Sequence, residues 1–106
     1  MPTYKVLAQS APSAATATTL YTATNATIVS TLNASNIGGT QDTIRIAVRP
    51  AGATLANQHY IAYGVPLAAG AVFSIQGGIT LANTDVITVY STTGNTSFSA
   101  FGSEGN

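Results

Sequence analysis

The most constraining feature of the sequence is the alternation of apolar and polar residues between Ile44 and Arg49. Apolar side chains stand at Ile44, Ile46 and Val48, with other residues between them. A period of two is typical of a β-strand with one buried and one exposed face. The run from His59 to Tyr63 is β-branched and aromatic and predicts the next strand. The residues expected in the core are Ile44, Ile46, Val48, Val86 and Phe98.

The rest of the chain repeats this pattern of short apolar runs between turn-forming residues. Further strands are predicted within residues 4–8, 20–23, 27–32, 71–75, 86–89 and 96–101. The Ala-rich stretch 11–17 contains Pro12 and is diluted by Ser and Thr, so no helix is expected there. Such spacing predicts an all-β fold, a single β-sandwich or jelly-roll-like domain of about eight to nine short antiparallel strands.

The sequence also indicates domain boundaries. Residues 1–17 hold one short strand, Tyr4 to Ala8, and then a polar stretch that we expect to be a flexible N-terminal arm. The β-sandwich is expected to span residues 18–102, and residues 103–106 are expected to form a loose C-terminal tail.

The low charge excludes several classes of function. Charged residues make up 6% of the 106 residues, against about 25% in an average soluble protein, and the formal net charge is zero. No basic stripe for nucleic acid can be built from three cations. No apolar run approaches the ~20 residues of a membrane span, and no signal-peptide pattern is present, so we expect use without export. A near-neutral surface promotes association, which favours a protein that becomes part of an assembly.

Catalytic and metal-binding patterns are not found. His59 is the only histidine, and no Ser lies in a Gly-x-Ser-x-Gly motif. The carboxylates Asp42, Asp85 and Glu104 are scattered and, without Cys, give no metal-ligand spacing. We expect Asp42 and Asp85 to hydrogen-bond the backbone at turns or strand ends, and His59 to be a surface or hydrogen-bonded residue. The sequence predicts a protein that is not an enzyme and has no cofactor or metal.

A docking surface is the remaining possibility. Arg45 and Arg49 lie on the same side of the predicted strand, about 13 Å apart. They are either solvated or bind an acidic partner, since the Arg fork pairs with carboxylates. Tyr60, Tyr63 and Tyr90 are expected in the core or at its edge. The candidate interface residues are Tyr4, Lys5, Arg45, Arg49, His59 and Tyr63.

Four runs of the sequence carry a family resemblance: residues 45–53 (RIAVRPAGA), 59–63 (HYIAY), 78–81 (GITL) and 98–104 (FSAFGSE). With the opening YKVLAQS of residues 4–10 and LYT of 20–22, they make the chain resemble small virion structural proteins of tailed bacteriophages, especially those of cyanobacteria. The resemblance implies a non-enzymatic protein made in the host cytoplasm and used at the particle surface. It implies a capsid decoration (cement) protein bound to the major capsid protein or another virion protein, or alternatively a tail, baseplate or fibre component.

Two further expectations concern other partners and the oligomeric state. A carbohydrate-binding module using Tyr63 or Tyr90 is a function from another class, and an enzyme is the weakest hypothesis. A lone terminal strand before a flexible link suits pairing with a neighbour's sheet edge. We therefore expect a homotrimer, which would match the local threefold positions of a capsid, with Tyr4 to Ala8 contacting a neighbouring chain.

Overall fold

The computed structural model describes residues 3–105, which form eight β-strands and two single turns of 3-10 helix. The strands are β1 (Thr3–Ser10), β2 (Thr18–Thr22), β3 (Thr27–Asn36), β4 (Asp42–Arg49), β5 (Tyr60–Leu67), β6 (Val72–Leu81), β7 (Val86–Ser91) and β8 (Thr96–Glu104). The turns η1 (Pro50–Gly52) and η2 (Asn57–His59) lie between β4 and β5. The part of the chain described contains no α-helix, as the short apolar runs predict.

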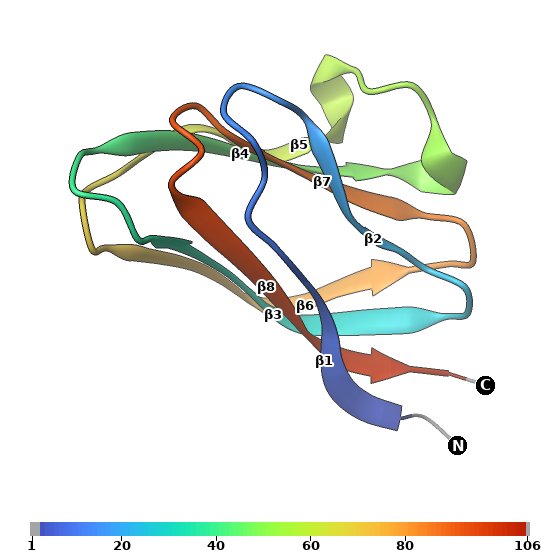
Figure 1. Cartoon of the computed structure of the whole chain (residues 1–106). Coiled ribbons are helices and arrows are strands. Elements are labelled where there is room, and N and C mark those ends of the chain that lie inside the picture. The colour runs from blue at the N-terminus through green and yellow to red at the C-terminus, as the bar shows by residue number, and fades with distance from the viewer. Residues whose placement is uncertain (1–2, 106) are drawn as a thin grey trace.

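The strands form two antiparallel four-stranded sheets packed face to face (Figure 1). One sheet has the order β1-β8-β3-β6 and the other β2-β7-β4-β5. Every connection except that between β4 and β5 crosses from one sheet to the other. This strand order is that of a jelly roll, and the predicted all-β sandwich is confirmed.

The topology can be described as one long hairpin rolled up on itself. Its two ends meet where Thr3 pairs with Glu104, and its middle is closed where Ala47 pairs with Tyr60. Between these points β2 pairs with β7 and β3 with β6. In these four ladders each residue of the first half lies opposite one at a similar distance from the other end of the chain.

The core lies between the sheets and is built from the alternating apolar residues. Its most completely buried large side chains are Phe98, Leu32, Ile44, Ile46 and Ile87. Four of the five predicted core residues are buried, and the fifth, Val48, is half-buried but packs against the core. Val48 lies near the end of β4, where the chain turns into η1 and covers it less completely.

The predicted boundaries at both chain ends need correction. Strand β1 is part of the sandwich, because it pairs with β8 of the same chain from Thr3 to Ser10. The following stretch is held as well: Pro12 is buried, and the Ala15 N–H donates to the Ser91 carbonyl at 2.8 Å. At the C-terminus β8 continues to Glu104, so residues 103 and 104 are strand and not tail. The expected contact of Tyr4 to Ala8 with a neighbouring chain stays a prediction.

Bulges adjust which face several side chains occupy. The register of β5 against β4 shifts at Ile61 and again at Gly64, where φ is +67°. The register of β3 against β6 also shifts, at Gly77 and Gly78 of β6. A glycine accepts such a positive φ without a Cβ clash, so these glycines permit the extra residue of a bulge.

Candidate functional site

The three carboxylates are used to hold the chain together. Asp42 is buried where β4, β7 and β8 meet. It accepts hydrogen bonds from the hydroxyls of Ser91 and Thr96 and from the N–H groups of Thr43 and Thr93. Burial alone would raise the pKa of Asp42, but these four donors outweigh it and lower the pKa from 3.8 to about 2. Asp42 is therefore an ionised structural residue.

Asp85 fastens one loop to another, as its position at a turn predicts. Its two carboxylate oxygens accept from the N–H groups of Ala51, at 2.8 Å, and Ala82, at 2.9 Å. These two hydrogen bonds lower the pKa of Asp85. The contact with Ala51 ties the turn η1 to the turn between β6 and β7.

Lys5 and Glu104 form an ion pair within the chain. Lys5 Nζ lies 2.8 Å from Glu104 Oε1, and the Tyr21 hydroxyl donates to Glu104 Oε2 at 2.5 Å. The hydrogen bond from Lys5, followed by that from Tyr21, lowers the pKa of Glu104. Lys5 was predicted as an interface residue. Its charge is neutralised within the chain, because the β1–β8 ladder brings it to Glu104, and its place in an interface stays a prediction.

His59 is also held within the chain. Its side chain is buried, with 8% exposed, and its Nδ1 accepts a hydrogen bond from the Ala56 N–H at 3.0 Å. The imidazole thereby holds the single turn η2 at the entry to β5. The expectation of a hydrogen-bonded histidine is confirmed, and its assignment to a docking surface stays a prediction.

Arg49 is also occupied within the chain. Its Nε donates to Thr88 Oγ1 at 3.0 Å, and its Nη1 donates to the carbonyls of Ala53 at 2.9 Å and Gly52 at 3.4 Å. Arg49 therefore joins the β4–β5 connection to β7 by hydrogen bonds. It lies on the outer face as predicted, and its Nε and Nη1 are engaged within the chain, so binding to an acidic partner stays a prediction.

Arg45 occupies a different environment, between two tyrosine rings. Its guanidinium carbon lies 4.5 Å from the centroid of the Tyr63 ring and 4.3 Å from that of Tyr90. The three residues form one row across the sheet, since Arg45 pairs with Tyr63 in β5 and with Tyr90 in β7. Each such cation–π contact is worth about 0.5–1 kcal/mol at an exposed site.

Tyr60 joins this row because of the bulge at Ile61. Simple alternation would place Tyr60 and Tyr63, three residues apart, on opposite faces of the sheet. The extra residue brings both to the outer face, where their ring centroids lie 4.8 Å apart at an interplanar angle of 81°. These tyrosines were predicted in the core or at its edge, which is wrong for Tyr63, 61% of which is exposed. The group of Arg45, Tyr60, Tyr63 and Tyr90 is called the tyrosine–arginine cluster below.

Beside the cluster lies an open hollow of about 450 Å³, lined by Asn57, Tyr60 and Tyr63. Asn57 comes from η2, whose fold is held by His59. Among the described residues, no hydrogen bond engages the Asn57 amide or the hydroxyls of the three tyrosines. The hollow thus combines aromatic surface with unpaired polar groups.

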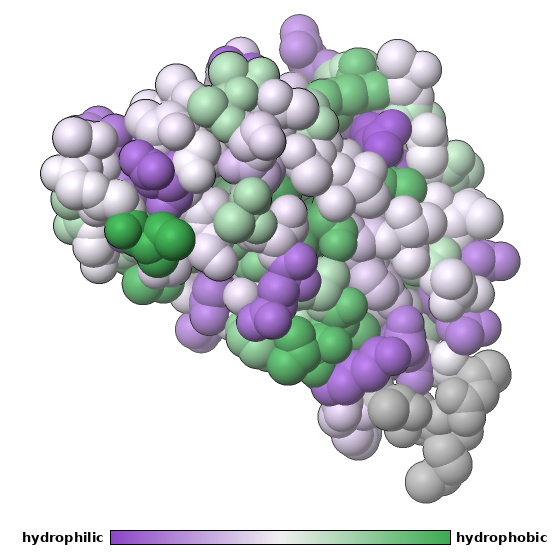
Figure 2. Space-filling model, in the orientation of Figure 1, coloured by the Kyte–Doolittle hydropathy of each residue, from purple (hydrophilic) through white to green (hydrophobic). Residues whose placement is uncertain are grey.

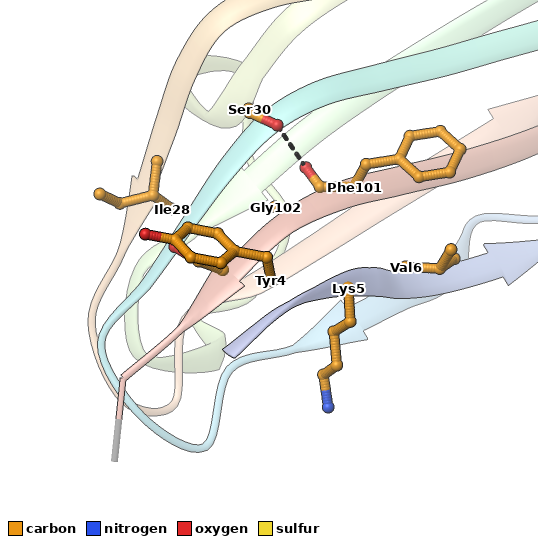
Figure 3. Close-up of a pocket in the computed structure, with 8 residues that line it drawn as sticks. Tyr4, Lys5, Val6, Ile28, Ser30, Phe101 and Gly102 are labelled. Carbon is orange, nitrogen blue, oxygen red and sulfur yellow. Dashed lines mark hydrogen bonds between the residues drawn. The ribbon is translucent and has the colours of Figure 1, made fainter. Parts of the chain in front are cut away.

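The opposite sheet carries a second surface feature, an apolar patch. Tyr4 and Val6 of β1, Ile28 of β3 and Phe101 of β8 line an open hollow of about 760 Å³ (Figure 3). Tyr4 is 81% exposed, and Val6 and Ile28 are each 50% exposed. Figure 3 shows Tyr4 on the same side of the sheet as Ile28, with Lys5 on the other side of its strand. These four residues are called the β1 apolar patch below.

Of the predicted interface residues, Tyr4 thus lies in the β1 apolar patch, and Arg45 and Tyr63 lie in the tyrosine–arginine cluster. Figure 2 shows a mostly pale surface over which small groups of strongly hydrophilic and strongly hydrophobic residues are scattered. Within residues 3–105 there is no group of three or more His, Asp or Glu that could hold a metal ion. No helix in that range is long and apolar enough to span a membrane.

Comparison with protein-family models, with curated proteins and with solved structures found no match to this chain.

Proposed function

We propose that this protein is a non-enzymatic structural component of a tailed-bacteriophage particle, acting as a capsid decoration protein. The observation that carries the proposal is the β1 apolar patch beside the open edge of β1. A large exposed tyrosine, a valine and an isoleucine on one sheet face are costly in water and gain free energy when a partner covers them. The family resemblance of the sequence supports a virion protein as that partner.

The charges favour a partner with a neutral, apolar surface. Lys5 is paired with Glu104 close to the patch, and Asp42 and Asp85 are used inside the chain. Docking would therefore depend on apolar contact at the patch and would be insensitive to salt. A protein that docks in this way suits the exterior of an assembled head, where the major capsid protein is already in place.

The open edge of β1 also supports the proposed homotrimer. In the sheet order β1 is terminal, so its outward main-chain groups have no partner strand among the described residues. Unpaired edges invite pairing with another chain. Threefold association around this edge would bring three β1 apolar patches together at a local threefold position of a capsid.

The test is binding of purified protein to particles that lack it. The double variant Tyr4→Ser with Ile28→Ser should reduce occupancy on particles at least about tenfold, because two exposed apolar contacts are removed. Val72→Ser is the matched control, since Val72 is 59% exposed on β6 at the far edge of the same sheet.

Equal occupancy of the double variant and the control would contradict docking through the β1 apolar patch. Cryo-electron microscopy of the same particles locates the protein directly. If the density lies on the tail or baseplate and not on the head, the protein is a tail or baseplate component and not a capsid decoration protein.

A further inference from the structure

We propose that the tyrosine–arginine cluster, together with Asn57, is a binding site for a carbohydrate that carries a carboxylate, such as a uronic acid. This site is on the sheet opposite the β1 apolar patch and does not depend on the proposed docking role. Its recognition elements are the aromatic surface and unpaired polar groups that line one hollow and an uncompensated cation, Arg45, which packs on the Tyr63 ring at its side.

The charge of Arg45 favours an acidic ligand. Of the three Lys and Arg residues, Lys5 has Glu104 and Arg49 has three hydrogen-bond acceptors. Arg45 makes neither an ion pair nor a hydrogen bond with any residue in the described range, and its buried Nε has no acceptor. Packing between two rings restricts the orientation of the guanidinium, and a carboxylate is the group that matches its planar fork.

The rings supply the surface on which a sugar would lie. Tyr60 and Tyr63 stand nearly at right angles, 4.8 Å between centroids, and so form two walls of the hollow. A pyranose presents a face of C–H groups that packs on the electron-rich face of an aromatic ring. The Asn57 amide and the tyrosine hydroxyls lie at the same place to bond sugar hydroxyls.

The dimensions favour a small glycan over a protein partner. The hollow of about 450 Å³ lies in the range of small-molecule sites, about 300–1,000 Å³. Among the described residues of the cluster and the hollow, Arg45 carries the one charge, which suits one carboxylate better than an extended acidic surface. The alternative occupant, an acidic segment of another protein, is separated from the glycan by the experiment below.

The position of the site follows from the two-layer architecture. The cluster lies on the outer face of the β2-β7-β4-β5 sheet, and the β1 apolar patch lies on the outer face of the other sheet. These faces point in opposite directions (Figure 1). One face can therefore be covered by a partner while the other stays open to solvent and available to a glycan.

The experiment titrates the isotope-labelled protein with trigalacturonate and follows amide shifts by NMR. The expected result is saturable binding with the largest shifts at Asn57, Tyr60 and Tyr63. The neutral galactose trisaccharide should bind at least about tenfold more weakly, because it cannot pair with Arg45. Tyr63→Ala should lose binding, and Arg45→Lys, which keeps the charge but not the planar fork, should weaken it about tenfold.

Tyr4→Ala, on the opposite sheet, is the control and should bind trigalacturonate like the unchanged protein. The proposal is overturned if trigalacturonate produces no saturable shifts in the unchanged protein, or if acidic and neutral sugars bind equally. It is also overturned if an Asp/Glu-rich peptide binds the same residues more tightly than trigalacturonate, which would assign the cluster to a protein partner. Because the first test uses the unchanged chain, it does not depend on any variant folding.

Discussion

At the scale of single residues, Asp42 connects the two sheets and gives the fold a defined pH dependence. Its pKa is 3.8 in an unfolded chain and about 2 in the folded protein, so the folded state favours the ionised form. The resulting stabilisation is fully present above pH 3.8 and is lost as the pH falls through about 2. A shift of this size corresponds to about 2 kcal/mol.

Asp42→Asn tests this account. The amide group of Asn places a donor where four donors already converge, so we expect a cost of about 1–3 kcal/mol in the free energy of unfolding at neutral pH. The acid-unfolding curve of the variant should be flatter between pH 3.8 and about 2. Asp85→Asn, at a partly exposed carboxylate, should cost less. Denaturant titrations over this pH range measure both, and an unchanged acid dependence in Asp42→Asn would refute the assignment.

Gly102 is required for a different reason, the close approach of two strands. A Cβ at this position would lie 2.0 Å from the Ile28 carbonyl oxygen and 2.9 Å from Val29 Cα. Both are backbone atoms and cannot move aside, so Gly102→Ala should destabilise by about 1–3 kcal/mol or more. Gly39→Ala is the control, because nothing lies within 4 Å of its Cβ position, and its effect should stay within about 0.5 kcal/mol. Equal denaturation midpoints for the two variants would show that the strands can separate freely.

At the scale of elements, β1 tests whether the N-terminus belongs to the fold or to an arm. It pairs with β8 from Thr3 to Ser10, and Leu7 and Ala8 pack against the core. Deleting residues 1–10 should therefore lower the melting temperature strongly or abolish folding. Adding a synthetic peptide of residues 1–10 should restore the β-sheet signal in circular dichroism. A truncated chain that melts like the full chain would return β1 to the role of a separate arm.

The elements also show how far the sequence could predict the site. Alternation was sufficient for β4, where Ile44 and Ile46 point inward and Arg45 outward, because no bulge interrupts the strand against β7. It failed for Tyr60 and Tyr63, since a bulge at Ile61 changes the face of every residue before it. Gly64, a glycine directly after the predicted strand, was the available signal of irregular pairing.

The sequence could not predict contacts that depend on the register between distant strands. The row of Tyr63, Arg45 and Tyr90 exists only because β5 and β7 flank β4. Likewise, Lys5 meets Glu104 only because the two chain ends pair. Composition predicted a neutral surface suited to association, but it contained no information on where the apolar residues of β1, β3 and β8 would gather.

At the scale of the whole molecule, the rolled hairpin divides the chain into two interdependent halves. All six strand pairings join one strand of β1–β4 to one strand of β5–β8. Among residues 3–105, no strand pairing lies within either half. Because most pairings join distant segments, folding must close long loops before contacts form, and we expect it to be slow for a chain of this length.

This division makes a direct prediction about fragments. Cutting between Ala53 and Thr54, both exposed in the β4–β5 connection, yields residues 1–53 and 54–106. Each fragment alone retains strands without any partner strand and half of a core, so each should be unfolded by circular dichroism. Mixed at equal concentration, they should recover the β-sheet spectrum, with a midpoint that rises with concentration because folding has become bimolecular. Gly102→Ala in the second fragment should weaken this association, whereas Gly39→Ala in the first should not. A native-like spectrum from either fragment alone would contradict the interdependence of the halves, since it would require strand pairs that the jelly roll does not contain.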